Sequence, residues 1–231
     1  MMQPGSFVLT FFAALLIYTP ALAAGLADLT NRDAVAGLQE ALVKGSHAAV
    51  EHLGVENGFF GNERVKIPLP DSFKRTERLL RSVGLGKHAD ELVLRMNRAA
   101  EAAAPEAKTL LVSAVKTMSV QDAKGILTGG DDAATQYFKR TTSDPLAKSF
   151  LPIVKKSMEK VKVAEQYDEF ARRGSRFGLV KEQDANLENY ITRKALDGLF
   201  IVIAEEEKKI RKDPIGSASA IISKVFGALR K

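Results

Sequence analysis

The stretch ALDGLFIVIAEEEKKIRK, residues 195–212, decides the fold class of this chain. It is apolar on nearly every side from Leu199 to Ala204, and it then becomes strongly charged. A helix that is apolar all round must be surrounded by protein, whereas a charged helical end lies in solvent. We therefore predict one long helix from Asp184 to Lys212, with its middle at the centre of a helical bundle.

Working outward from this helix, nearly every segment repeats its apolar residues at spacings of three and four, as helices do. Further helices are predicted at about 30–54, 71–83, 87–103, 105–118, 119–128, 131–143, 144–173 and 213–229. The alanine-rich run at 97–111 predicts a close helical hairpin around Pro105. Asp144 followed by Pro145 predicts a helix cap and a first-turn proline, and Pro152 either kinks this helix or marks where the true helix begins.

Residues 54–70 interrupt the helical pattern with three glycines and two prolines. Val65, Ile67 and Leu69 alternate with other residues, which favours a small hairpin inside a long structured loop. The fold class that follows is all-α: a single bundle of about eight to ten helices with one long loop at 54–70.

The first 23 residues, MMQPGSFVLTFFAALLIYTPALA, carry no charge and end in Ala21-Leu22-Ala23. An apolar run closed by a small-x-small motif is typical of a cleaved export signal, although this one lacks a basic residue at its start. The alternative, a transmembrane anchor, needs about 20 apolar residues, and the run from Phe7 to Tyr18 is shorter. We predict a signal peptide at 1–23, a single all-helical domain at 24–231, and a periplasmic or secreted protein that is not transmembrane after cleavage.

Charge and cysteine content limit the function classes. The chain has no cysteine, which excludes disulfides, a lipidated cysteine and a thiolate metal site. Its net charge is +6, and residues 139–181 hold eleven Lys or Arg against five Asp or Glu. Such a segment attracts phosphates, anionic lipid or nucleic acid, but solvated helix faces give the same count. For an exported chain we favour solvated faces, then anionic lipid, and expect no nucleic acid.

The stretch ILTGGDDAATQYFKRTT, residues 126–142, places two glycines before two aspartates. A phosphate-binding loop follows a strand and carries a lysine, whereas these aspartates would repel phosphate. An EF-hand loop needs oxygen ligands at alternate positions and a late glutamate, which are absent. We interpret the stretch as a helix joint in which Gly129 or Gly130 has a positive φ and Asp131 caps the next helix.

Two groups of residues remain as candidate binding sites. The first is a surface site beside this joint, made by Asp132, Tyr137, Lys139 and Arg140. The second is RRGSRFG, residues 172–178, whose Arg172, Arg173, Arg176 and Phe177 could hold an anion under a stacked ring. A basic helix end that complements the helix dipole explains the second group more simply.

No motif predicts catalysis. His47 and Glu51 are spaced to bind one metal ion from one helix, but no second ligand pair accompanies them. In GSRFG, residues 174–178, the serine comes one position too early for a nucleophile elbow. We predict no catalytic residue, no metal site and no cofactor.

Five segments carry a family resemblance: KIPLP at 66–70, MSVQDAKGILTGGDDAATQYF at 118–138, FLPIVKKSM at 150–158, KALDGLFIVIAEEEKKIRKDP at 194–214 and KVFGAL at 224–229. From about Leu26 to Leu229 the chain resembles a bacterial family of exported helical proteins catalogued only as a domain of unknown function. The resemblance implies an exported all-helical protein in which the Gly-Gly-Asp-Asp stretch is a family hallmark. It implies no catalytic residue.

Two functions from different classes are consistent with these features. The first is a non-enzymatic envelope protein whose helices, above all the last one, hold an apolar ligand, an anionic lipid or a helix of a partner envelope protein. The alternative is a periplasmic hydrolase that uses carboxylates and a histidine. A pocket gathering His47 or His88 with acidic residues and a perturbed pKa would favour the hydrolase.

Overall fold

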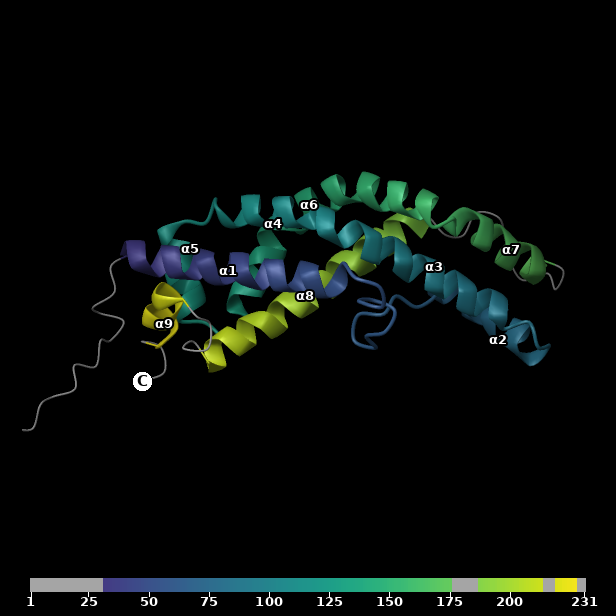
Figure 1. The fold of residues 1–231 in the computed structure, drawn as a ribbon, viewed down its shortest axis with the longest axis horizontal. Coiled ribbons are helices and arrows are strands. Elements are labelled where there is room, and N and C mark those ends of the chain that lie inside the picture. The colour runs from purple at the N-terminus through teal and green to yellow at the C-terminus, as the bar shows by residue number, and fades with distance from the viewer. Residues whose placement is uncertain (1–30, 176–186, 214–218, 228–231) are drawn as a thin grey trace, which may run out of the picture.

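The structure is a computed structural model that describes residues 31–175, 187–213 and 219–227 (Figure 1). These residues form the elements α1 (Asn31–Leu53), η2 (Asp71–Phe73), α2 (Lys74–Ser82), α3 (Lys87–Ala103), η3 (Ala104–Glu106), α4 (Ala107–Val115), α5 (Val120–Leu127), α6 (Ala133–Lys160), α7 (Val163–Ser175), α8 (Leu187–Lys212) and α9 (Ala220–Gly227). They contain no strand, so the all-α prediction is confirmed. Within them, no helix is both long and apolar enough to cross a membrane. The predicted signal peptide at 1–23 lies outside the described residues.

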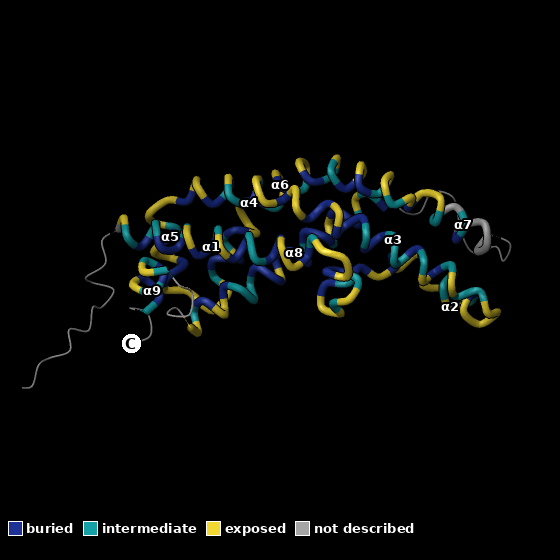
Figure 2. Tube along the Cα trace, viewed as in Figure 1, coloured by how far each residue is buried: buried dark blue, intermediate teal, exposed yellow. Residues whose placement is uncertain are grey.

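Helix α8 lies at the centre of the bundle, as its sequence predicts. It packs against α1 along one side and against α6 along another. Leu199, Phe200, Val202 and Ile203 are buried, while Ile201 remains 37% exposed. Buried segments lie on the inner sides of the helices, and exposed segments on the outer sides (Figure 2). The buried apolar side chains of the described residues join in a core cluster that extends from α1 to α9.

The loop between α1 and α2 is structured, but the predicted hairpin inside it is wrong. Alternate residues of 65–69 are buried, as the sequence pattern indicates. No strand pairs with this segment; instead Asn97 of α3 accepts a hydrogen bond from the Ile67 N–H and donates one to the Ile67 carbonyl, both at 2.8 Å. Glu101 accepts hydrogen bonds from the N–H groups of Phe59 (3.1 Å) and Phe60 (2.9 Å). Side chains of α3 thus satisfy the loop backbone that a second strand would otherwise satisfy.

The predicted helical hairpin around Pro105 is also wrong. Figure 1 shows α3 and α4 following one another along the molecule, joined by η3. The backbone at Ala103, Ala104, Glu106 and Ala107 stays in the right-handed helical region. A proline removes one backbone hydrogen bond, but it does not reverse the chain without turn residues beside it. The alanines allow close packing against other helices rather than a fold-back.

The predicted cap at Asp144 is wrong as well, because α6 continues through both Pro145 and Pro152. A proline inside a helix costs about 3 kcal/mol. Packing offsets this cost, because the same helix buries Phe138, Leu146, Phe150 and Val154. Tertiary packing therefore decides the continuity of α6 against the local signal.

The Gly-Gly-Asp-Asp stretch joins α5 to α6 as predicted, but by different means. Among the described residues, Gly84 is the glycine with a positive φ, so the φ prediction for Gly129 and Gly130 is wrong. Asp131 does not cap α6, and Asp132 holds the cap position without a side-chain cap hydrogen bond. Gly129 instead allows a close approach, since a Cβ there would lie 2.6 Å from the Cβ of Ala133.

The two glycines should therefore respond differently to alanine. Gly129→Ala forces Ala133 to move and is expected to lower the free energy of unfolding by about 1–3 kcal/mol. Gly130→Ala meets nothing within 4 Å, and it should leave stability unchanged or raise it by up to about 1 kcal/mol. Urea denaturation of both variants measures the difference. Equal effects at the two positions would contradict the close-approach account.

Candidate functional site

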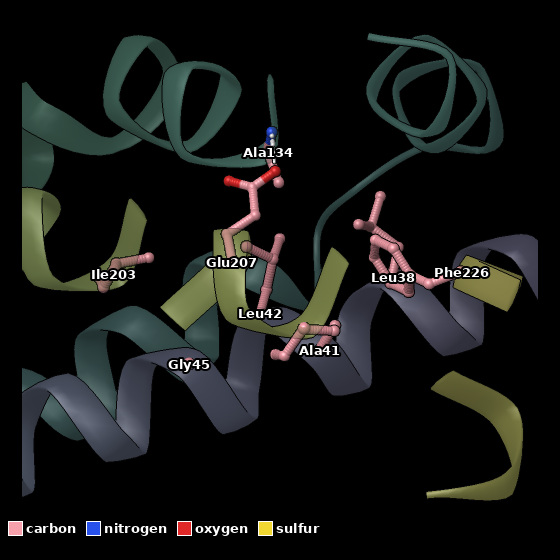
Figure 3. A pocket seen from close by; sticks show the side chains of 9 residues that line it. Leu38, Ala41, Leu42, Gly45, Ala134, Ile203, Glu207 and Phe226 are labelled. Carbon is pink, nitrogen blue, oxygen red and sulfur yellow. Dashed lines mark hydrogen bonds between the residues drawn. The ribbon is translucent and has the colours of Figure 1, made fainter. Parts of the chain in front are cut away.

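The start of α6 is capped by a carboxylate from α8 (Figure 3). Glu207 accepts hydrogen bonds from Ala134 N at 3.0 Å, Thr135 N at 2.9 Å and Thr135 Oγ1 at 2.7 Å. Arg211 donates to the same carboxylate and also to the carbonyl of Ile126, at the end of α5. We call Glu207 and Arg211 the α8 latch, because together they tie the end of α5 and the start of α6 to α8.

A small cavity lies beside the α8 latch, lined by apolar side chains such as Leu38, Leu42, Ile203 and Phe226. Its volume is about 10 Å³, which is room for about one water molecule. This cavity has no space for an acyl chain or another apolar ligand. The contacts of the α8 latch tie α5, α6 and α8 together.

Two residues of the predicted surface site beside the joint contact each other, and one of them also contacts α5. The Tyr137 hydroxyl donates to Asp122 Oδ2 at 3.2 Å, and Arg140 lies 5.7 Å from the centre of the Tyr137 ring. Asp132 accepts a hydrogen bond from Gln136 instead of facing them. Tyr137 and Arg140 thus contact each other, but Asp132 does not join them.

Asp122 and Tyr137 have shifted pKa values. The hydrogen bond from the Ser119 hydroxyl, which caps α5, holds the pKa of Asp122 below its usual 3.8, and Tyr137 contributes to the same shift. Burial raises the pKa of the Tyr137 phenol, and the Asp122 carboxylate adds to this rise. Both shifts favour a charged Asp122 carboxylate and a neutral Tyr137 phenol, the two forms that the hydrogen bond between them requires.

These shifts predict an acid-sensitive joint. A carboxylate whose pKa is lower in the folded state stabilises the fold above its unfolded pKa, near 4, and this stability is lost as pH falls through the folded pKa. We expect Asp122→Asn to lower the melting temperature at pH 6, and the difference from wild type to shrink below about pH 4. Thermal melts of both proteins from pH 3 to pH 7 measure this difference in melting temperature. A difference that does not change with pH would contradict a lowered pKa of Asp122 in the folded state.

The second predicted group lies mostly outside the described part of the structure. Arg172 and Arg173 belong to α7, but their side chains lie outside the described part of the structure. Arg176 and Phe177 lie outside the described residues altogether. These four stay a prediction.

Among the described residues, the histidines do not gather with acidic side chains into a metal site. His88 Nδ1 lies 3.9 Å from Glu169 Oε1, and His47 belongs to α1. In the described ranges, no three His, Asp or Glu side chains gather closely enough to hold a metal ion. Neither the small cavity beside the α8 latch nor the open hollows along α3, beside α1 and between α6 and α8 are lined by a histidine. The hydrolase alternative thus finds no supporting site in this part of the chain.

Helices α6 and α8 run antiparallel, and two contacts show their register. The rings of Phe138 and Phe200 lie 5.8 Å apart, and Lys155 Nζ lies 3.8 Å from Glu188 Oε1. Later residues of α6 therefore meet earlier residues of α8. Continuing this register between the two contacts aligns residue 144 with residue 197 and residue 148 with residue 193.

An open groove of about 420 Å³ lies between these two helices. Asp144 and Lys148 line it from α6, and Arg193 and Asp197 line it from α8. The register aligns acid with acid at one end of the groove and base with base one turn away. None of the four forms an ion pair within 4 Å in the described part of the chain. We call this feature the α6–α8 groove.

The floor of the α6–α8 groove is apolar, with one buried hydroxyl. Leu151, Leu196 and Phe200 contribute to its lining. Thr192 lines it too; this side chain is 4% exposed and its hydroxyl has no hydrogen-bond partner. An apolar surface with a few unpaired polar groups is the usual composition of a ligand site.

Two other hollows show the opposite pattern. The one beside α3, of about 600 Å³, includes Glu91, Arg95, Arg98 and Glu101. Arg95 pairs with Glu91 at 2.8 Å, and Arg98 pairs with Glu101. The hollow between α1 and the end of α8, of about 250 Å³, contains the ion pair of Glu206 and Lys209. A charged side chain that is already paired within a hollow gains little additional electrostatic free energy from a charged ligand.

The sequence contained a partial signal for the α6–α8 groove that our sequence reasoning missed. Asp144 with Lys148 and Arg193 with Asp197 are both acid–base pairs at i, i+4 spacing. Such pairs commonly stabilise a single helix. Only the antiparallel register brings them to one surface with like charges facing each other.

Comparison with known proteins identifies a family. The family model described as "Protein of unknown function (DUF4197)" matches residues 28–227. No curated protein and no solved structure matches the chain. The comparison supplies no ligand and no activity, so the site has to be interpreted from its own residues.

Proposed function

The chain belongs to the DUF4197 family, whose description assigns no activity, and we propose that it is an exported, non-enzymatic protein that binds an amphipathic ligand in the α6–α8 groove. The observation that carries this proposal is the set of four charges that form no ion pair among the described residues and that line the groove together with apolar side chains. Of the four, Arg193 also lies 6.0 Å from the centre of the Tyr190 ring. An exposed charge gains little from solvent alone, but it contributes to binding when a ligand supplies the opposite charge.

Three features support the other parts of the proposal. The uncharged segment at 1–23 has the pattern of an export signal. The lining of the α6–α8 groove contains no histidine, the side chain most often used for proton transfer. The internal cavity beside the α8 latch is too small for an apolar ligand, which favours a surface groove for the proposed binding. A lipid or a lipid-like molecule, with both polar and apolar parts, fits such an open groove best.

The experiment is a ligand search on the full chain. The protein is expressed with its N-terminal segment, the cell is fractionated, and native mass spectrometry measures ligands that co-purify. We expect the protein in the envelope fraction with an amphipathic ligand bound. Lys148→Glu with Arg193→Glu should remove most of that ligand, because the basic end of the groove becomes acidic.

A matched control uses the same helix. Lys156 and Lys160 are exposed on α6 and do not line the groove. Lys156→Glu with Lys160→Glu changes the net charge by the same amount, and it should retain the ligand. Equal loss in both double variants would show that overall charge, not the α6–α8 groove, holds the ligand. A protein found in the cytoplasm would overturn the proposed export.

A further inference from the structure

The order of charges along the α6–α8 groove narrows the ligand class. Asp144 and Lys148 lie four residues apart on α6, as do Arg193 and Asp197 on α8. Four residues of a helix span about 6 Å. Because the helices are antiparallel, both walls present their acid at one end and their base at the other. The groove thus has an acidic end and a basic end, although the charges of these four side chains sum to zero.

Resting on the proposed function, we propose that the α6–α8 groove is selective for a zwitterionic ligand that joins a phosphate to a primary ammonium, as an ethanolamine phospholipid headgroup does. The guanidinium of Arg193 and the ammonium of Lys148 match the phosphate oxygens. The carboxylates of Asp144 and Asp197 accept hydrogen bonds from a primary ammonium. An ethanolamine arm bridges the two ends.

A simple anion fits this groove less well. It would be attracted to Lys148 and Arg193, but Asp144 and Asp197 lie one turn away and would repel it. A zwitterion of the right orientation gains from both ends. A choline group carries no N–H to donate to the carboxylates, so it should bind more weakly than an ethanolamine group.

The remaining lining fits the rest of such a ligand. The apolar floor formed by Leu151, Leu196 and Phe200 provides contact for glycerol and the first methylenes of a lipid chain.

A second copy of the chain is the main competing occupant. A two-fold rotation would place the acidic end of one groove against the basic end of the other, which satisfies the charges. It would also set one hollow against another, and the two hollows of about 420 Å³ would not fill each other. The shape therefore favours a small zwitterion over self-association.

The test measures binding of short-chain phospholipids by isothermal titration calorimetry, below their micelle concentrations. The probes are dihexanoyl phosphatidylethanolamine, the choline and glycerol counterparts, and free phosphoethanolamine. We expect the ethanolamine lipid to bind best. Binding of free phosphoethanolamine would identify the headgroup as the recognised part, and binding of the lipid alone would show that the apolar floor is also required; both support the inference.

Neutralising each end separates the two roles. The double variant Asp144→Asn, Asp197→Asn should bind the ethanolamine lipid about tenfold or more less tightly than wild type, and it should bind the anionic glycerol lipid more tightly. The double variant Lys148→Gln, Arg193→Gln should bind both lipids less tightly. The control double variant Lys156→Gln, Lys160→Gln lies outside the groove and should leave the binding of both lipids unchanged. Circular dichroism melts establish that each variant is folded.

Several results would overturn the inference. If the Asp144→Asn, Asp197→Asn variant binds the ethanolamine lipid as tightly as wild type, the acidic end does not recognise an ammonium. If the groove holds a different co-purifying ligand, the zwitterion inference fails while the proposed function stands. If no ligand depends on the groove, both fail. A groove-dependent dimer in sedimentation without lipid binding assigns the surface to a second copy instead.

Discussion

Replacing Glu207 with alanine is expected to lower the free energy of unfolding by about 3–5 kcal/mol, because it leaves a buried cation unpaired. The Glu207 side chain is 5% exposed and that of Arg211 is 11% exposed. Without the carboxylate, the N–H groups of Ala134 and Thr135 also lose their acceptor. Urea denaturation followed by circular dichroism measures the loss.

The neighbouring residue provides the control. Glu206 lies on the same helix and pairs with Lys209, whose side chain is 67% exposed. Glu206→Ala should cost about 1 kcal/mol or less, as partly exposed ion pairs usually do. If the two alanine variants lose similar stability, the α8 latch does not hold the joint between α5 and α6.

Phe226→Ala is expected to have an effect of similar size, about 3–5 kcal/mol, because it empties a fully packed aromatic site. Phe226 is 2% exposed, and Ile222 and Val225 of the same helix are completely buried. The guanidinium of Arg211 lies 5.4 Å from the Phe226 ring, so the loss also affects the α8 latch. Thermal and urea melts measure it.

Lys224→Ala on the same helix is the matched control for Phe226. Lys224 is 52% exposed and pairs with Asp33 at 2.8 Å, and its loss should cost about 1 kcal/mol or less. A small effect of Phe226→Ala would contradict a structural role for α9. The expected large effect would show that α9 is part of the core, and not the binding element for an apolar ligand or a partner helix that the sequence suggested.

Periodicity predicted the helices well where one face is consistently apolar. The bounds of α3 agree with the prediction, and α1 and α8 agree wherever the chain is described. Their positions in the core follow from which residues are apolar, a property that each helix carries in its own sequence.

Local signals failed where another element controls the backbone. Pro145 and Pro152 lie inside α6 because packing offsets their cost. The start of α6 is capped from α8, 73 residues away from Ala134 in the sequence. The extended segment around Ile67 finds its hydrogen bonds on Asn97. Hydrogen-bond partners this distant in the sequence produce no local sequence pattern from which they could be predicted.

The candidate site was missed for a related reason. Sequence reasoning assigned Asp144 to a helix cap and pointed to Tyr137 and Arg140, which the structure places in contacts at the α5–α6 joint. The α6–α8 groove exists only once the register of two antiparallel helices is known. Charge order along that groove is a property of the pair, not of either helix.

The most direct test of the central claim is photo-crosslinking inside the envelope. A photo-reactive residue is introduced in place of Ala147, which lines the α6–α8 groove, and in a second protein in place of Lys156, which lies outside it on the same helix. Our account predicts a ligand adduct of one defined mass at position 147 and none at position 156. Equal labelling at both positions, or no adduct at position 147, would contradict it.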